Sequence, residues 1–368
     1  MDNIFNIIIN LIVFVPIILI FSILPYITRK DIMFGITIPP SEWKNDYFKK
    51  LRKSYVTISI VSGVIFLTGN AISSALLSEQ LSVVFMQVLL WSALLVYFLL
   101  YLFFWIKTKK YKEKANWIIN AKNVAVADTK TDYKKRSLSP MWFLVYLVLI
   151  LVTYFGALQL FELAPNMIPV RYDINGDPSV FQPKSLRIVY QMIGMQVFMG
   201  LLFFIVNFTI RRAKKTIDPA NPEESSIRND VMKYRWSIFL FVTGLLMLLI
   251  FAQALFSMFV TMPVWAILYM PMGATLIILA YAIILAVKTG QSGSKIKSSI
   301  DKKTGTEITR DDDSLWKLGM FYYNKDDPAV FIEKRFGAGW TNNWARWQSW
   351  LFIGIIVCII VVTALFST

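Results

Sequence analysis

Few residue types in this chain could do chemistry, and the most suggestive acidic residues lie in two short stretches. Asp173, Asn175 and Asp177 alternate as the first ligands of a calcium loop do, but Lys184 stands where that loop needs its bidentate glutamate. Residues 311–313 are three consecutive aspartates, which could in principle hold a divalent metal. An acidic run beside lysine-rich sequence is more often a solvated stretch, so we expect no metal site in either place.

Composition excludes several classes of enzyme. The chain has no histidine and a single cysteine, Cys358, so disulfides, nucleophile–histidine triads and the usual zinc and haem ligand sets cannot form. We therefore expect a non-enzymatic protein without catalytic residues or cofactors.

Helices that cross a membrane would position whatever functional side chains the protein has. Eight apolar runs are each long enough to span about 30 Å of hydrocarbon as a helix. Their approximate bounds are 3–27, 55–77, 82–106, 140–160, 188–210, 236–259, 263–287 and 349–367. The sequence predicts an all-α integral membrane protein with eight transmembrane helices in a phospholipid bilayer.

Basic residues predict the orientation of these helices. Of the 38 Lys and Arg residues, 35 fall in the four alternate gaps 28–54, 107–139, 211–235 and 288–348. Because basic residues near helix ends stay in the cytoplasm, these gaps are expected inside and both termini outside. Charge spread over four loops favours anionic lipid headgroups or an acidic cytoplasmic partner, and it argues against nucleic-acid binding.

The middles of the runs contain amides and hydroxyls but no Asp, Glu, Lys or Arg. A charged residue there would have marked a proton relay or an ion pathway, so an ion-coupled transporter is disfavoured. We expect the polar residues to form hydrogen bonds between helices. They include Asn70, Ser73, Ser74, Gln87, Gln191, Gln196, Asn207 and Gln253.

The longest outer loop, between the fourth and fifth runs, predicts a small ordered cap. Two prolines stiffen its entry, and Asn175-Gly176 favours a two-residue type I′ turn between short extended arms. We expect this extracytoplasmic hairpin to bind a ligand. The candidate residues are Pro165, Ile168, Pro169, Arg171, Tyr172, Asp173, Asn175, Gly176 and Asp177.

The last inner loop predicts a small cytoplasmic module before the eighth helix. Asp327 and Pro328 have the pattern of a helix N-cap and first turn, and Gly337 would end that short helix. Trp340, Trp344, Trp347 and Trp350 recur every three or four residues, which favours one interfacial aromatic face on a helix. The candidate residues of the module are Trp316, Tyr322, Tyr323, Asn324, Gly337, Gly339, Trp340 and Trp344.

Two segments resemble a known family. Pro165, Ile168-Pro169, Tyr172 and Gly176-Asp177-Pro178 resemble the extracytoplasmic motif of SdpI-like bacterial membrane proteins, although Arg171 stands where many members carry histidine. The string from Trp316 to Trp344 resembles a module of unknown function that often accompanies this motif. Residues 34–39, Phe-Gly-Ile-Thr-Ile-Pro, look like a further element of such proteins.

The resemblance implies a multi-pass protein of a bacterial cytoplasmic membrane, related to immunity proteins that protect a cell from its own secreted toxin. Our hypothesis is a non-enzymatic receptor or immunity protein that meets a secreted peptide or lipid-like ligand outside and a cytoplasmic protein partner inside. The alternative is a permease or exporter component for a peptide or lipid. An intramembrane enzyme that uses Asp311, Asp312 and Asp313 is a third possibility. The ligand and the oligomeric state stay open.

These observations divide the chain into five parts. Residues 1–139 form a three-helix membrane segment, and 140–210 form the SdpI-like helix–loop–helix with its cap. The part 211–287 contains a connector, which we expect to be solvated at 211–235, and the sixth and seventh helices. The cytoplasmic Trp-rich module is 288–348, and 349–368 is the eighth helix.

Overall fold

A computed structural model describes residues 2–117, 137–173, 175–215, 217, 222–296, 311–354 and 357. The chain forms two compact units, each of them built from several segments. Unit 1 contains residues 1–6, 133–211 and 233–285, and unit 2 contains 7–132, 212–232 and 286–368.

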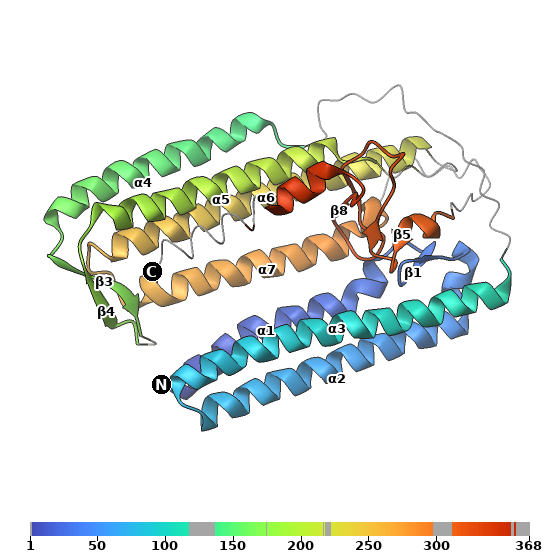
Figure 1. Ribbon diagram of the computed structural model, residues 1–368, viewed down its shortest axis with the longest axis horizontal. Helices are drawn as coiled ribbons and strands as arrows, with labels where there is room; N and C mark the ends of the chain where they lie inside the picture. The colour runs from blue at the N-terminus through green and yellow to red at the C-terminus, as the bar shows by residue number, and fades with distance from the viewer. Residues whose placement is uncertain are drawn as a thin grey trace. The chain divides into compact units, whose positions relative to one another are not determined.

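Seven helices of the described chain are long and apolar enough to cross a membrane (Figure 1). They are α1 (Asp2–Ile27), α2 (Asp46–Leu76), α3 (Glu79–Ala115), α4 (Leu144–Leu163), α5 (Leu186–Arg212), α6 (Pro222–Ser257) and α7 (Met270–Thr289). They confirm seven of the eight predicted runs. Residues 347–354 are helical, and most of the eighth run lies outside the described residues.

Two helices begin well before their apolar runs. The Asn45 side chain caps α2 by accepting from the Tyr47 N–H, and the first turns of α2 bury Phe48 and Leu51. Pro222 at the first position of α6 and the glutamates after it start that helix inside the expected connector. The prediction of a solvated stretch up to residue 235 is therefore wrong, because Ser226 and Asn229 are buried on this part of α6.

Short helical turns join the longer elements. Four are 3-10 helices, η1 (Pro40–Lys44), η3 (Pro140–Phe143), η5 (Gln291–Gly293) and η6 (Asp313–Leu315). The fifth, η4 (Trp265–Tyr269), has π-helical geometry and leads into α7 just before Pro271. The missing N–H of Pro271 accounts for an irregular turn at this place.

Four separate two-stranded antiparallel sheets complete the described fold. Unit 1 contains β3 (Met167–Tyr172) with β4 (Pro178–Pro183), which we call the hairpin. Unit 2 contains β1 (Ile32–Met33) with β2 (Ile36–Thr37), β5 (Trp316–Lys317) with β6 (Phe321–Tyr322), and β7 (Phe331–Glu333) with β8 (Trp340–Asn342).

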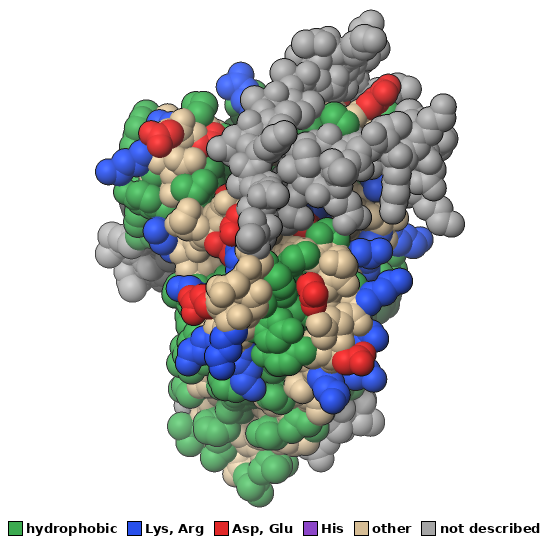
Figure 2. Space-filling model, turned by 90° about the vertical axis from the view of Figure 1, so that its right-hand side faces the viewer, with side chains coloured by type: hydrophobic (Ala, Val, Ile, Leu, Met, Phe, Trp, Pro, Cys, Tyr) green, Lys and Arg blue, Asp and Glu red, His purple; other side chains and the backbone are tan. Residues whose placement is uncertain are grey.

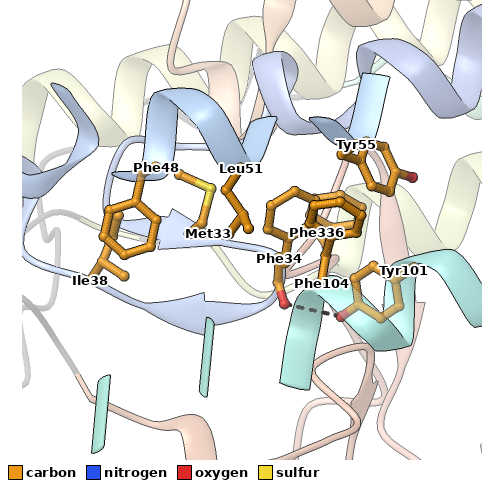
Figure 3. Close-up of a cluster of buried hydrophobic side chains, with 9 residues drawn as sticks. All are labelled: Met33, Phe34, Ile38, Phe48, Leu51, Tyr55, Tyr101, Phe104 and Phe336. Carbon is orange, nitrogen blue, oxygen red and sulfur yellow. Dashed lines mark hydrogen bonds between the residues drawn. The ribbon is translucent and has the colours of Figure 1, made fainter. Parts of the chain in front are cut away.

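The largest buried cluster of unit 2 joins segments that are far apart in the sequence (Figure 3). Phe34 lies at its centre, with ring centroids 5.1 to 5.6 Å from those of Tyr55, Phe104 and Phe336. Phe34, between α1 and α2, and Phe336, near the C-terminus, therefore share one hydrophobic core with residues of α2 and α3. Unit 1 has its own clusters, one of which packs Ile168 of the hairpin against helical residues.

Candidate functional site

The hairpin is rooted in unit 1 by one buried side chain. Ile168 in β3 has no exposed surface, and it packs with Val189 of α5 and Leu255 of α6. Full burial of an isoleucine side chain stabilises by about 2 kcal/mol. The predicted hairpin is thus confirmed, and its strand β3 is packed against α5 and α6.

The turn of the hairpin differs from the predicted one. Strands β3 and β4 are joined by five residues, 173–177, and the Gly176 N–H donates to the Asp173 carbonyl at 3.1 Å, so Asn175 and Gly176 are not the two central residues of the tight turn. Asp173 closes the loop instead, because its Oδ1 accepts from the Asn175 N–H at 2.9 Å and the Asp177 N–H at 2.8 Å. The hydrogen bonds to the Asp173 carboxylate therefore outweigh the preference of Asn175-Gly176 for a type I′ turn.

Three further contacts tie the hairpin to neighbouring elements. The Tyr172 hydroxyl donates to the carbonyl of Ser257 at 2.5 Å, and burial raises the pKa of this phenol. The Lys184 ammonium donates to the carbonyl of Ala164 at 2.8 Å, near the C-terminal end of α4. Gly176, at φ +84°, lies so close to Val264 that a Cβ atom would come within 2.9 Å.

The nine predicted hairpin residues therefore divide by role. Ile168, Gly176, Tyr172 and Asp173 build the hairpin, and Pro169 is half-buried in β3. The exposed members are Pro165, Arg171, Asn175 and Asp177. The Arg171 guanidinium forms no hydrogen bond or ion pair with any residue that the structure describes.

The second group of predicted residues belongs to a polar module, which we define as residues 28–45 and 311–346. Its centre is Arg335, which is 4% exposed. The Arg335 guanidinium donates to the carboxylates of Asp312 and Asp313 and to the Thr37 hydroxyl. The Thr37 N–H and hydroxyl donate to the same Asp313 oxygen at 3.0 and 2.7 Å.

The Lys112 ammonium at the end of α3 lies 2.7 Å from carboxylate oxygens of Asp311 and Asp313. The predicted solvated stretch holds for the exposed Asp311 but not for Asp312 and Asp313, which are partly buried because Arg335 and Lys112 come from distant parts of the sequence. Burial alone would raise the pKa of Asp313, but Arg335 and Lys112 outweigh it and hold that pKa below its usual value. The described residues contain no group of three or more acidic, His or Cys side chains arranged to hold a metal ion.

Asp327 does not start a helix, contrary to the prediction. Its Oδ1 accepts from the Ala329 N–H at 3.0 Å, but the chain then extends into β7, where Ile332 is buried against Trp316 and Tyr322. The predicted helix up to Gly337 is therefore replaced by the β7–β8 hairpin. Burial of the apolar strand outweighs the local capping signal.

Asp327 instead joins two other side chains. Its Oδ2 accepts from the Tyr322 hydroxyl at 3.0 Å and the Lys214 ammonium at 2.7 Å. Burial tends to raise the pKa of Asp327, but the hydrogen bonds from Lys214, the Ala329 N–H and Tyr322 together outweigh it, and the pKa is lowered. Burial raises the pKa of Tyr322 to about 12. Of the other predicted module residues, Tyr323 is exposed and Asn324 donates to the Tyr322 hydroxyl at 3.1 Å.

The predicted face of four tryptophans on one helix is also wrong. Trp340 lies in β8 and Trp344 in a turn, and only Trp347 and Trp350 belong to the terminal helical segment. The side chains of Trp347 and Trp350 are 69% and 59% exposed. Gly337 and Gly339 both have positive φ and form the bend between β7 and β8, so Trp340 begins a strand and not a helix.

Sequence reasoning missed Arg335, Thr37 and Asn343. The Asn343 side chain is fully buried and donates to the carbonyls of Asn324, Asp327 and Ala329 at 2.8, 3.1 and 3.2 Å. The only signal for Thr37 was its place in the segment 34–39. Nothing in the local sequence marks Arg335 as the partner of two aspartates.

Three predicted interior amides make interhelical contacts. The Gln196 amide donates to the carbonyl of Leu248 at 2.9 Å, and Asn70 of α2 donates to Asn10 of α1. Asn207 of α5 accepts from the Ser237 hydroxyl of α6. These bonds agree with the prediction that the interior polar residues form hydrogen bonds between helices. Amide groups used in this way are not free to line a polar path through the membrane.

Comparison with known proteins gives one partial match. Residues 325–350 match a family of unknown function (DUF5808). The matched residues contain β7, β8, Asp327, Arg335 and Asn343, so this part of the polar module is similar to a family of unknown function. No curated protein and no solved structure matches the chain.

Proposed function

We propose that this protein is a non-enzymatic membrane receptor of the immunity type. In this proposal the hairpin recognises a secreted peptide or lipid-like ligand outside a bacterial cytoplasmic membrane, and the polar module contacts a cytoplasmic partner. The observation that carries the proposal is the exposed Arg171, whose guanidinium forms no ion pair with a described residue, on a hairpin whose base is held by Ile168, Tyr172 and Lys184. A cation on a preordered hairpin can bind an anionic group without first breaking an internal ion pair.

The length of α5 supports opposite locations for its two ends. This helix begins three residues after β4 and continues for 27 residues to Arg212, about 40 Å at 1.5 Å per residue. A helix of this length crosses the hydrocarbon core, so its two ends would be on different sides. The expected positive-inside orientation places Arg212 in the cytoplasm.

The polar module supports the inner part of the proposal. Figure 2 shows Lys and Arg side chains, together with some Asp and Glu side chains, on the face that it draws. Four acidic residues of the module, Asp311, Asp312, Asp313 and Asp327, are paired with Arg335, Lys112 or Lys214. An acidic partner would therefore meet exposed cations and a preformed surface.

A genetic comparison tests the proposed function. The gene is deleted in the cell of origin and restored on a plasmid, and survival is measured in the culture supernatant of the same strain. We expect the deletion strain to be sensitive and the restored strain to be protected. Equal survival of both strains in every secreted fraction contradicts an immunity function.

A further inference from the structure

Arg52 in α2 is a buried cation without an acidic partner. Its side chain is 6% exposed, and its Nη2 donates to the carbonyl of Trp43 at 3.0 Å. Its Nε and Nη1 are buried and have no hydrogen-bond partner among the described residues. The guanidinium carbon lies 4.2 Å from the centroid of the Trp43 ring, but attraction to an aromatic face does not neutralise the charge. A buried charge of this kind strongly favours an anion beside it.

The acidic residues nearest to Arg52 in the sequence bind other groups. The Asp46 carboxylate lies 2.9 Å from the Lys49 ammonium. The Glu42 carboxylate accepts from the Asn45 amide at 2.6 Å. Arg52 therefore has no counter-charge among the described residues, and an anion from outside the chain can supply one.

Arg52 lies where α2 would enter a membrane. The apolar run 55–77 begins three residues after it, and α2 is long and apolar enough to span a bilayer. Tyr26 near the end of α1 and Trp43 in η1 both lie beside the guanidinium. Tyrosine and tryptophan are typical of the headgroup level of a membrane. The phosphate groups of lipids are the anions that are abundant at this level.

The Tyr26 side chain separates the guanidinium from the surface. Its hydroxyl interacts with Arg52, and the side chain is 45% exposed. Exposed side chains change rotamer within nanoseconds, so Tyr26 can turn away and uncover the guanidinium. Its hydroxyl is neutral and does not compensate the charge of Arg52, whereas a phosphate in its place does.

We propose that Arg52, between Trp43 and Tyr26, binds the phosphate group of an anionic phospholipid on the expected cytoplasmic side. A guanidinium suits this ligand because it can donate several N–H groups to the oxygens of one phosphate. Lys49, three residues before Arg52 on the same side of α2, is half-exposed and favours a headgroup with a net negative charge. The site lies within unit 2 and does not depend on the proposed ligand of Arg171.

Lipid titration of the full chain tests the proposal. The protein is kept in detergent micelles, and bound molecules are counted by native mass spectrometry. The probes are dioctanoyl phosphatidylglycerol, dioctanoyl phosphatidylcholine, dioctanoylglycerol and inorganic phosphate. We expect phosphatidylglycerol to bind about tenfold more tightly than each of the other three. Equal binding of dioctanoylglycerol, which has the same chains without a phosphate, would overturn the proposal. Equal binding of inorganic phosphate would show that the site does not require a lipid and would also overturn it.

Variants of α2 assign the binding to Arg52. Arg52→Gln should weaken phosphatidylglycerol binding about tenfold, and Arg52→Lys, which keeps the charge with fewer donors, should weaken it severalfold. Lys50→Gln is the matched control, because it removes one positive charge about 160° around the same helix and should leave the affinity unchanged. Circular dichroism without lipid confirms that each variant is folded.

A purely structural role of Arg52 gives a different result. If the guanidinium only holds Trp43, then Arg52→Lys lowers the unfolding temperature but leaves the preference for phosphatidylglycerol over dioctanoylglycerol unchanged. That result, or equal weakening by Arg52→Lys and Lys50→Gln, would overturn the proposal. Both comparisons remain decisive if Arg52→Gln does not fold.

Discussion

Two arginines in two regions of the molecule show how surroundings decide the role of a residue. Arg335 in the polar module is buried, and its guanidinium is neutralised by Asp312 and Asp313. Arg171 in the hairpin is exposed, and its guanidinium forms no ion pair with a described residue. Removing a buried cation leaves its fixed partners without a counter-charge and destabilises the fold, whereas an exposed unpaired cation remains available for a ligand. Substitutions in the two regions should therefore separate stability from recognition.

The largest effect is expected for Arg335→Ala. The change leaves Asp312 and Asp313 partly buried without their main cation and removes the bond to Thr37. We expect a loss of about 3 kcal/mol in the free energy of unfolding, measured by denaturant titration in nanodiscs. Lys317→Ala, at an exposed lysine of the same module, is the control and should cost less than about 0.5 kcal/mol. Equal effects of both changes would contradict a structural role for Arg335.

Asp313→Asn should have a smaller effect, and its size should depend on pH. The pKa of Asp313 in the folded protein lies below the usual 3.8, so the unfolded chain takes up a proton first as the pH falls. The stabilisation is fully present above that usual value and is lost as the pH falls through the lowered folded pKa. We expect Asp313→Asn to cost about 2 kcal/mol at neutral pH.

Unfolding curves measured from about pH 6 to about pH 3 check this dependence. The difference between wild type and Asp313→Asn should become smaller towards the acidic end. Asp327, whose pKa is also lowered, should keep part of the acid sensitivity in the variant. A constant difference over the whole range would show that the charge of Asp313 does not contribute.

In the hairpin, Tyr172→Phe should have a local effect. The substitution removes the hydrogen bond from the phenol to the Ser257 carbonyl but keeps the ring. We expect a cost of about 1 kcal/mol, detected as faster amide hydrogen exchange in residues 167–183. Tyr323→Phe, at an exposed tyrosine of the polar module, should leave this exchange unchanged. Unchanged exchange in Tyr172→Phe would mean that the hydroxyl does not hold the hairpin.

Local sequence predicted elements whose causes are themselves local. The apolar runs gave seven helices, and the prolines with Asn175-Gly176 gave a hairpin, although Asp173 determines its turn. The capping pattern at Asp327 was misleading, because burial of Ile332 in a strand outweighs one cap. Local patterns contain no information on such competing tertiary contacts.

The network around Arg335 could not be predicted for the same reason. Arg335 and Thr37 are 298 residues apart in sequence, and each has ordinary neighbours. The run of aspartates resembles solvated sequence until Arg335 and Lys112 are placed beside it. Resemblance to a family singled out the segment 34–39 but gave no contact for Thr37.

Arg171→Ala tests the central claim most directly. Because the guanidinium is exposed and pairs with no described residue, the change should alter the free energy of unfolding by less than about 0.5 kcal/mol. Survival in the culture supernatant is then measured for deletion cells that carry wild type or Arg171→Ala at equal membrane levels. The account predicts that the variant loses protection and stays as stable as wild type. Full protection by Arg171→Ala would contradict recognition through this residue.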